Sequence, residues 1–296
     1  MTKSVPSGPT GLVVVDKEAG WTSHDVVARV RTVFAQRRAG HSGTLDPDAT
    51  GVLLVGLGRV TRVLRYLTAL GKEYTAEIVL GSATDTLDAS GAVVAEWDMS
   101  AVTLSEARAA AAGLTGLVQQ VPPMVSAVKV GGRRLYELAR LGVVVERAPR
   151  TVRVDRFDLE ASDEPGVLRT TVACSSGTYV RTLAADLGAA LGGGAHLRHL
   201  RRTRVGSFTA GEAQPVGALD ASSLRSPADA LRDLDRVTVG PDAVQLVAVG
   251  RPLDKVPLGA TGDGPWALVD QTGRLLAVYE RTVGHRIRPA AVLVAR

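Results

Sequence analysis

The stretch Gly40-His-Ser-Gly-Thr-Leu-Asp-Pro-Asp-Ala-Thr-Gly51 has the most unusual composition in this sequence of 296 residues. It combines three glycines, one proline and two carboxylates in twelve positions, which is typical of a loop that must follow one particular backbone path. Such loops carry function more often than helix surfaces do. Because Asp46 precedes Pro47, its backbone is biased toward an extended conformation that presents the carboxylate. The structural alternative is a local turn in which Asp46 only caps backbone amides.

The sequence on both sides of this loop alternates irregularly between strand and helix patterns. Apolar and β-branched runs predict strands at 11–16, 52–55, 74–80, 92–97, 126–130, 151–160 and 167–175. We expect 92–97 to lie beside 74–80. Capping residues and apolar periodicity predict a helix of about ten residues after Thr103 and further helices at 24–35, 60–70 and 179–191. Several strands follow one another directly, which favours an α+β fold with a mixed sheet flanked by helices.

The composition changes after residue 208. Residues 209–228 contain Pro215, Pro227 and three serines but few apolar side chains, which predicts a linker. Beyond it the pattern predicts a short helix at 243–249, a hairpin turn at 271–273, and strands at 266–270, 275–279 and 291–294. We therefore expect a first domain at 1–228 and a small β-rich domain at 229–296.

The overall composition excludes several classes of protein. Hydrophobic residues make up 45% of the chain and charged residues 22%, which is sufficient for a sizeable core and argues against disorder. No apolar run approaches the ~20 residues of a membrane-spanning helix, and the N-terminus lacks a secretory signal, so we expect a cytoplasmic protein. Cys174 is the only cysteine, which excludes an intrachain disulfide and a multi-thiolate metal site. We expect neither a metal nor a cofactor.

The formal net charge of +5 is distributed unevenly. Residues 129–156 carry eight Lys or Arg against three acids, and residues 196–204 carry four arginines and no acid. These two segments together contribute +9, which leaves −4 for the rest of the chain. Concentrated basic charge is typical of a surface that binds a polyanion, since contacts to phosphates release counterions and supply much of the affinity. A solvated helix surface is the alternative for either segment.

Other motifs in the sequence are weaker. Gly56-Leu-Gly-Arg-Val-Thr61 follows a predicted strand, as a dinucleotide fingerprint would, but Thr61 stands where the third glycine is needed. A nicotinamide-dependent oxidoreductase is therefore a distant alternative. The carboxylate pairs 46/48 and 85/88 could suggest a glycoside hydrolase, but their spacing in sequence does not fix the carboxylate separation on which that chemistry depends.

Further short blocks with a distinctive order lie before and after the 40–51 loop in the sequence. They are Asp16-Lys17 with Gly20-Trp-Thr-Ser23, Lys72-Glu-Tyr74, Gly81 to Asp88, Cys174-Ser-Ser-Gly-Thr-Tyr-Val-Arg181, and Gly194-Ala-His-Leu-Arg-His-Leu-Arg-Arg202. In order and spacing over about residues 10–210, these blocks resemble the TruB family of bacterial tRNA pseudouridine synthases. Glu18 departs from the family, which commonly has proline there. The region after about 230 is similar, more loosely, to the PUA-type RNA-binding appendage of these enzymes.

The resemblance implies an enzyme that isomerises uridine 55 in the T-loop of tRNA to pseudouridine. Asp46 matches the family's essential aspartate, which acts either as a nucleophile at C1′ or as a base toward the ribose. Arg181 matches the arginine that keeps this carboxylate ionised. Tyr74 matches the tyrosine that stacks on the target base and assists removal of the C5 proton.

The resemblance also implies a set of substrate-binding residues. Tyr179 and Leu200 match positions that line the uracil pocket, and His41 matches the histidine that fills the space left by the flipped nucleotide. Asp88 matches an acid that contacts the RNA. Charge and family context indicate phosphate contacts for Lys17, Lys129, Arg201 and Arg202. The basic segment 129–156 is expected to grip the T stem-loop of tRNA.

Two rival functions stay open at the level of sequence. Guide-RNA-dependent pseudouridine synthases share this catalytic core but rely on accessory proteins, whereas a basic segment of its own favours an enzyme that acts alone, as a monomer. A non-catalytic tRNA-binding or tRNA-folding protein on the same scaffold is the second rival. The presence of Asp46, Tyr74 and Arg181 together argues against it.

Overall fold

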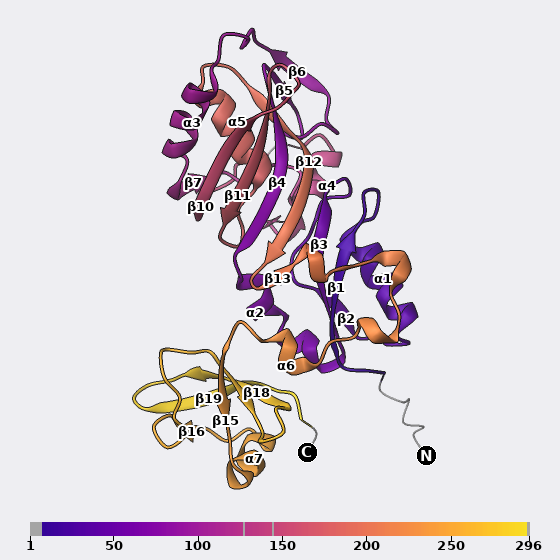
Figure 1. Cartoon of the computed structure of the whole chain (residues 1–296), viewed down its shortest axis with the longest axis vertical. Helices are drawn as coiled ribbons and strands as arrows, with labels where there is room; N and C mark the ends of the chain where they lie inside the picture. Colours follow the sequence, from indigo (N-terminus) through magenta and orange to yellow (C-terminus); the bar gives the residue numbers. More distant parts are fainter. Residues whose placement is uncertain (1–7, 127, 144, 295–296) are drawn as a thin grey trace.

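The structure is a computed structural model that describes residues 8–126, 128–143 and 145–294 (Figure 1). Within these residues a large mixed sheet has the strand order β14-β1-β3-β12-β4-β11-β10-β7, with β2 paired to β3 and β13 paired to β12. A second sheet has the order β15-β17-β18-β19-β16. Two parallel pairs, β1 with β14 and β3 with β12, make the large sheet mixed. The predicted α+β class with a β-rich C-terminal part is confirmed.

The elements have the following bounds. The strands of the large sheet are β1 (Gly11–Lys17), β2 (Ala39–His41), β3 (Thr50–Leu57), β4 (Lys72–Leu80), β7 (Gly116–Gln120), β10 (Arg150–Ala161), β11 (Val167–Cys174), β12 (Ala195–Val205), β13 (Phe208–Thr209) and β14 (Gln214–Pro215). Two hairpins lie outside it, namely β5 (Ser82–Thr84) with β6 (Val93–Glu96), and β8 (Lys129–Val130) with β9 (Arg133–Arg134). The second sheet consists of β15 (Asp235–Thr238), β16 (Leu253–Asp254), β17 (Trp266–Val269), β18 (Leu275–Arg281) and β19 (Arg286–Val292).

The helices are α1 (Ser23–Val33), α2 (Leu64–Ala69), α3 (Leu104–Gly113), α4 (Leu135–Arg140), α5 (Val180–Ala190), α6 (Pro227–Ala230) and α7 (Pro241–Ala248), with a short 3-10 helix η1 (Gly58–Arg62) before α2. Side-chain caps begin three of the helices, α1, α3 and α6. Thr22 caps α1 and Thr103 caps α3, each in a reciprocal capping box with the acid three residues later. None of these helices is long and apolar enough to cross a membrane.

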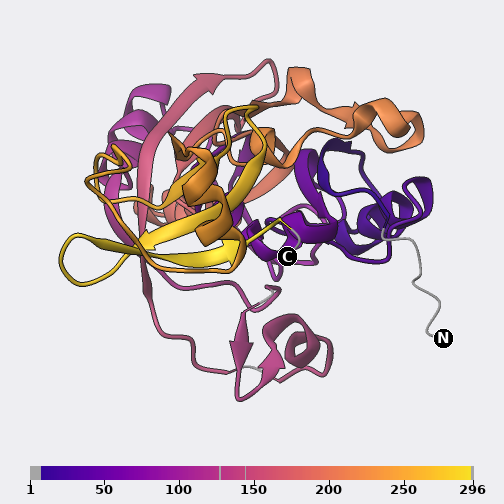
Figure 2. The same ribbon diagram turned by 90° about the horizontal axis from the view of Figure 1, so that it is seen from below.

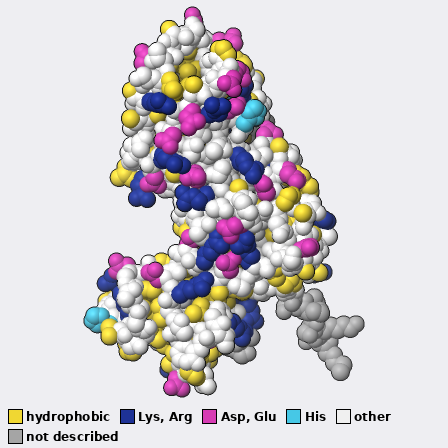
Figure 3. All heavy atoms as spheres, viewed as in Figure 1, with side chains coloured by type: hydrophobic (Ala, Val, Ile, Leu, Met, Phe, Trp, Pro, Cys, Tyr) yellow, Lys and Arg dark blue, Asp and Glu magenta, His cyan; other side chains and the backbone are white. Residues whose placement is uncertain are grey.

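Helices cover one side of the large sheet. Ala107 and Ala111 of α3 and Leu183 and Leu187 of α5 pack on the inner side chains of β4, β10, β11 and β12. The other half of the sheet, β1 and β3, packs against Val26 and further apolar residues of α1. On the opposite face, basic and acidic side chains are intermixed over the strands (Figure 3). The helix-covered side therefore holds much of the core, while a second buried cluster lies on the other face of β1 and β3.

The strand β12 joins the two halves of the large sheet. It pairs antiparallel with β4 and parallel with β3. The sequence pattern of 196–204 indicated a basic segment and not a strand, because four arginines interrupt the apolar residues at 195, 197, 200 and 205. The arginines are compatible with a central strand because its neighbours supply acidic and carbonyl partners for them.

Two further expectations were wrong. Residues 92–97 do not lie beside 74–80, because β6 pairs with β5 while β4 pairs with β11 and β12. Residues 209–228 are not a linker, since β14 extends the large sheet beside β1 and Arg225 exchanges backbone hydrogen bonds with Leu12. The predicted boundary at 228/229 falls inside α6, and the second sheet begins at Asp235.

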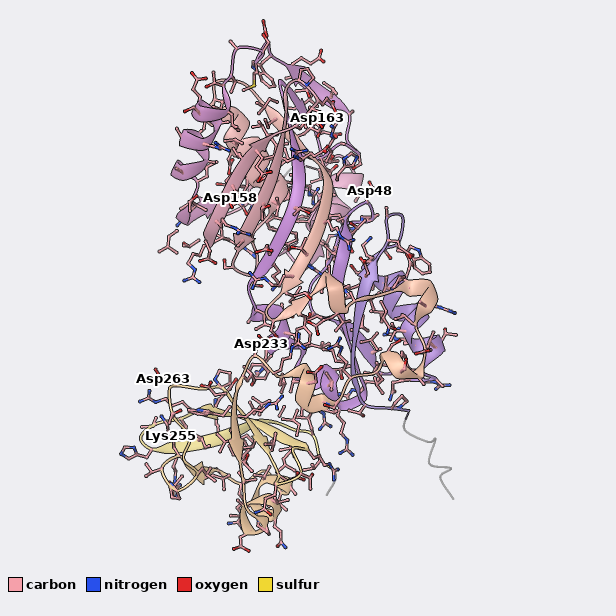
Figure 4. All side chains as sticks on the ribbon, in the orientation of Figure 1. Asp48, Asp158, Asp163, Asp233, Lys255 and Asp263 are labelled. Atoms are coloured by element: carbon pink, nitrogen blue, oxygen red, sulfur yellow. The ribbon has the colours of Figure 1, made fainter. Side chains whose placement is uncertain are left out.

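The second sheet is attached to the rest of the chain by a shared core. Leu12 and Val14 of β1 and Val63 before α2 belong to the same buried cluster as Val269 and Val278 of the second sheet. Polar contacts surround it. Arg59 donates to the Leu293 carbonyl at 2.6 Å, and Glu280 accepts from Arg65 and Tyr66 at 2.8 Å each. Asp233, at the junction (Figure 4), accepts from the Ser207 amide at 3.0 Å.

The segment that contains β8, β9 and α4 extends away from the body of the molecule (Figure 2). Leu135 and Leu138 are buried within it. We call residues 128–143 the projecting lobe. It belongs to the basic segment 129–156 of the sequence.

Candidate active site

The loop between β2 and β3 carries Asp46, and its backbone is fixed on both sides of that residue. The Ser23 hydroxyl accepts from the Leu45 amide at 2.9 Å and donates to the Leu45 carbonyl at 3.1 Å. The Pro47 carbonyl accepts from the Gly20 amide at 3.0 Å. The first turn of α1 and the end of β1 thus hold the loop in the conformation that presents Asp46.

The carboxylate of Asp46 pairs with Arg181 in the first turn of α5. Asp46 Oδ2 lies 3.2 Å from Arg181 Nη2, and the Arg181 side chain is only 5% exposed. The guanidinium also donates to the carbonyls of Thr86 at 2.9 Å and Val125 at 2.7 Å. Because the carboxylate pairs with an arginine 135 positions away in the chain, Asp46 does more than cap a local turn.

Asp88 is bonded to the same arginine. Its Oδ2 lies 3.1 Å from Arg181 Nη1, and its Oδ1 accepts from the hydroxyls of Thr86 and Ser90 at 2.6 Å each. Both carboxylate oxygens therefore have partners within the protein. Asp88 thus pairs with one terminal nitrogen of Arg181 and Asp46 with the other, and the RNA contact expected for Asp88 stays a prediction.

These surroundings shift the ionisation of Asp46. Removal from water raises the pKa of its carboxyl above the usual range, and the charge of Asp88 adds to that effect. The guanidinium of Arg181 opposes it most strongly, followed by the ammonium of Lys17. The two cations therefore keep the carboxylate ionised to a lower pH than its burial alone would allow.

Two fully buried cations hold the loop around Asp46. The Lys17 ammonium donates to the carbonyls of Trp21 at 2.6 Å, Pro47 at 2.8 Å and Glu18 at 3.0 Å. The Arg202 guanidinium donates to the carbonyls of Val52 at 2.7 Å, Gly43 at 3.2 Å and Thr44 at 3.4 Å. Their relative exposures are 0% and 2%. The phosphate contacts predicted for Lys17 and Arg202 therefore do not fit the structure, because neither side chain reaches the surface.

A cavity of about 280 Å³ opens beside Asp46. It brings together six residues that the sequence singled out, namely Asp46, Tyr74, Tyr179, Arg181, Leu200 and Arg202. Lys72, which belongs to the Lys72-Glu-Tyr74 motif but was not predicted as a site residue, also lines it. Burial lowers the pKa of the Lys72 ammonium to about 8, although it donates to the Leu70 carbonyl at 2.6 Å. The only sequence signal for Lys72 is its place two residues before Tyr74.

Tyr74 enters this cavity from β4. Burial raises the pKa of its phenol, and the positive charge of the neighbouring Arg202 opposes that shift. Tyr179 precedes α5, where Gln120 of β7 binds both its backbone amide at 2.7 Å and its carbonyl at 3.0 Å. The two tyrosines are thus fixed by different parts of the sheet and converge on one cavity.

A bulge in β12 aims Leu200 and Arg202 at the same cavity. The pairing of β12 with β4 shifts register between Arg198 and Arg201, and His199 has a φ of 53° in the left-handed region. The extra residue changes which side chains face inward. Gly51, with a φ of 100°, permits the close approach of β3, since a Cβ there would lie 2.1 Å from the Arg202 carbonyl oxygen.

Among the described side chains, four of the predicted substrate-binding residues do not line this cavity, namely Lys17, His41, Asp88 and Arg201. His41 lies at the end of β2, edge-to-face with His24 at 5.6 Å between ring centroids, and burial and His24 lower its pKa to about 4. Arg201 pairs with Asp16 at 2.7 Å, so its charge is already compensated within the protein. The side chain of Lys129 lies outside the part of the chain that the structure describes.

The excess charge of 196–204 is also compensated inside the fold. Arg198 pairs with Glu77 at 2.6 Å and with Glu164, and Arg204 pairs with Glu73 at 3.2 Å. Asp158 pairs in the same way with Arg156 on this face of the sheet (Figure 4). Acids on neighbouring strands therefore balance much of the positive charge of 196–204, and the polyanion-binding surface expected there stays a prediction.

The run 56–61 is explained by packing. Gly58 has a φ of 59°, and a Cβ there would lie 2.3 Å from the Thr10 hydroxyl. A Cβ on Gly56 would lie 3.0 Å from side-chain atoms of Val60 and Leu64. Both glycines permit close contacts within the protein, so the structure gives no support to a dinucleotide site at this position.

Comparison with known proteins extends these observations. Residues 31–180 match the model of the TruB family pseudouridylate synthase N-terminal domain, and residues 181–241 match the tRNA pseudouridylate synthase B C-terminal domain. The chain is 46% identical to tRNA pseudouridine synthase B of Mycobacterium bovis (strain BCG / Pasteur 1173P2) over 97% of this chain and 96% of that protein. It is 47% identical to the protein of the same name from Mycobacterium avium (strain 104), with 96% of each covered.

Solved structures agree with this assignment. A Cbf5-Nop10-Gar1 complex superposes with a TM-score of 0.72 and 27% identity, covering 97% of this chain and 84% of that chain. An H/ACA RNP bound to a substrate RNA containing 2′-deoxyuridine gives a TM-score of 0.72 and 25% identity over 97% of this chain and 86% of that chain. With the family models and the near full-length identity, these matches show that the chain belongs to the TruB family of pseudouridylate synthases.

Proposed function

We propose that this pseudouridine synthase acts on tRNA and converts uridine 55 of the T-loop to pseudouridine. The observation that carries the proposal is the convergence of Asp46, Tyr74 and Arg181 on one cavity. The relatives that are 46–47% identical are named for tRNA, whereas the structures that describe RNP assemblies are 25–27% identical. This difference favours tRNA as the substrate over a guide-RNA-dependent activity.

The reaction is an isomerisation with no net oxidation. The bond between N1 of uracil and C1′ of ribose breaks, the free base turns within the cavity, and C5 forms the new bond to C1′. C5 loses a proton and N1 gains one. Asp46 has two possible parts in this sequence. It attacks C1′ and is displaced when C5 attacks in turn, or it removes a ribose proton and later returns it. Either role needs an ionised carboxylate at the cavity wall.

The remaining cavity residues position the base. Tyr74 stacks on the uracil and assists removal of the C5 proton, while Tyr179 and Leu200 enclose the ring. Arg181 provides the positive charge beside Asp46. The target nucleotide must leave its stack to reach this depth, which costs a few kcal/mol. His41 lies close to the loop that carries Asp46 and is the residue we assign to the vacated position in the RNA.

The grip on the T stem-loop is assigned to two regions outside the cavity. A cavity of about 730 Å³ separates the projecting lobe, with Arg134 and Val143, from the body of the protein, with His24 and Asp46. RNA that enters this space would reach Asp46. The second sheet, from Asp235 onward, is the PUA-like part and would contact tRNA beyond the loop. A monomeric state and a cytoplasmic location stay predictions.

The experiment compares purified wild-type protein with the Asp46→Asn variant on an unmodified tRNA transcript. We expect the wild type to form pseudouridine at position 55 without added protein or guide RNA, as mapped by chemical sequencing and by tritium release from C5-labelled uridine. Asp46→Asn should lose turnover while its affinity for tRNA stays within a few fold. Modification at another position, or dependence on added factors, would contradict the proposed specificity, and normal turnover of Asp46→Asn would remove Asp46 from the mechanism.

A further inference from the structure

Arg202 lies in an unusual environment for an arginine. Its neighbours in β12 pair with carboxylates, as Arg198 does with Glu77 and Arg201 with Asp16. The Arg202 guanidinium instead donates to three backbone carbonyls while its residue is 2% exposed. Burial of a charge is costly unless the protein supplies partners for it. A neutral side chain could fill this space, so the retained charge needs an explanation.

The three carbonyls belong to the catalytic loop and to the strand that follows it. Gly43 and Thr44 lie three and two positions before Asp46, and Val52 lies in β3. A planar guanidinium can donate in several directions at once, which an ammonium cannot reproduce with the same geometry. Arg202 therefore fixes the distance between β12 and the start of the loop that presents Asp46.

The same residue lies beside the second functional group of the cavity. Arg202 and Tyr74 are directly opposite each other in the β12–β4 pairing, and both line the cavity. The positive charge of Arg202 opposes the rise that burial causes in the pKa of the phenol. One cation thus binds the loop of Asp46 and lies across the strand pair from Tyr74.

We propose that Arg202 is a positioning residue that sets the Tyr74 phenol and the Asp46 loop relative to each other for removal of the C5 proton. The inference rests on the proposed function, since it concerns the final step of pseudouridine formation. A phenol that assists this step gains negative charge as the proton moves toward it, and a fixed guanidinium stabilises that charge without further rearrangement. Arg202 acts through Tyr74 and needs no contact with the substrate.

The test is a double-mutant cycle on single-turnover rates at saturating enzyme, with Arg202→Lys, Tyr74→Phe and the double variant. Arg202→Lys retains a charge but loses the planar donor, and it should slow the reaction about 100-fold, as expected for a misplaced reacting group. If Arg202 acts through the phenol, the double variant should be slower than Tyr74→Phe alone by less than about threefold. Multiplication of the two single effects would overturn the proposal.

The deuterium isotope effect at C5 is a measurement that a general loss of structure would not change. With tRNA deuterated at C5 of the target uridine, Arg202→Lys should show a larger deuterium isotope effect on product formation than the wild type. A slower variant with an unchanged isotope effect would place the defect before proton removal and would contradict the proposal. If Arg202→Lys fails to fold, Arg202→Gln retains hydrogen-bond donors without the charge, and the same two outcomes apply to it.

Arg232→Lys is the matched control. Arg232 stacks on Phe208 with its guanidinium carbon 3.9 Å from the ring centroid and pairs with Glu212 at 2.8 Å, and it does not line the cavity of Asp46. The variant loses the same group at a partly buried site, where the Arg232 side chain is 22% exposed, so it should change the melting temperature and leave the isotope effect unaltered. Wild-type turnover separates the two proposals: an inactive wild type contradicts the function, whereas an active wild type with a fully active Arg202→Lys contradicts only this inference.

Discussion

The Asp46 loop and the projecting lobe face each other across one cavity, and different kinds of contact stabilise them. Around Asp46 the loop carbonyls receive hydrogen bonds from the buried side chains of Lys17 and Arg202. The lobe has a small apolar centre at Leu135 and Leu138 and stands apart from the body of the molecule (Figure 2). The loop is thus fixed by contacts from distant strands, whereas the lobe relies on local ones.

This difference separates chemistry from recognition. A reacting carboxylate must be held closely, because a displacement of about 1 Å can cost 100-fold in rate. A surface that binds a polyanion needs charge more than exact placement, since phosphate contacts act largely without regard to sequence. We therefore expect substitutions around the loop to change rate and stability, and substitutions in the lobe and its adjoining basic segment to change affinity.

The largest effect on stability is expected from Lys17→Met. The variant leaves the carbonyls of Glu18, Trp21 and Pro47 without their buried donor, and each such loss weakens folding. We expect a decrease of on the order of 1–3 kcal/mol in the free energy of unfolding, measured by urea denaturation. Turnover should fall as well, because Pro47 adjoins Asp46.

Glu18→Met is the matched control for this prediction. Glu18 neighbours Lys17 in the chain, is exposed, and contributes only a backbone carbonyl to the arrangement. Its replacement should leave both unfolding and turnover close to those of the wild type. Equal destabilisation by the two variants would mean that the end of β1, and not the buried ammonium, holds the loop.

The sequence predicted the loop better than it predicted what holds it. Glycine and proline restrict the backbone locally, so the path of 40–51 and the presentation of Asp46 could be inferred from residues next to each other. Lys17 and Arg202 read as free basic residues because their partners are backbone carbonyls, which leave no mark in a sequence. The arginines of β12 read as unpaired charges for a related reason, since Asp16, Glu73 and Glu77 lie more than 100 positions away in the chain.

Removal of positive charge from the 129–156 segment is expected to have an intermediate effect, which is a loss of tRNA affinity. Arg133 in the lobe and Arg150 at the start of β10 are exposed. The double variant Arg133→Gln/Arg150→Gln should weaken tRNA binding about tenfold and reduce the slope of log affinity against log salt by about 2. Its single-turnover rate at saturating enzyme should stay within twofold of the wild type.

Arg153→Gln is the matched control for these two substitutions. Arg153 belongs to the same segment, but its guanidinium lies 2.9 Å from Asp155, so its charge is partly compensated. The salt slope should therefore change less than for either Arg133 or Arg150 alone. If the lobe instead contributes directly to catalysis, the single-turnover rate of Arg133→Gln/Arg150→Gln at saturating enzyme should fall.

The smallest effect is expected from Asp88→Asn, measured as a pH profile. The negative charge of Asp88 raises the pKa of Asp46, so its removal lowers that pKa. Since the reaction needs ionised Asp46, the acidic limb of the single-turnover rate should move to lower pH when this like charge is removed. The amide retains an oxygen for Arg181, and its nitrogen can donate to the hydroxyls of Thr86 and Ser90, but the Ser90 backbone amide, 3.1 Å from Oδ1, loses its acceptor. Asp85→Asn, in the same loop but bonded to the Ala92 amide at 3.0 Å, should leave the limb in place. A shift to higher pH in Asp88→Asn would show that the loss of Arg181 orientation outweighs the loss of charge repulsion.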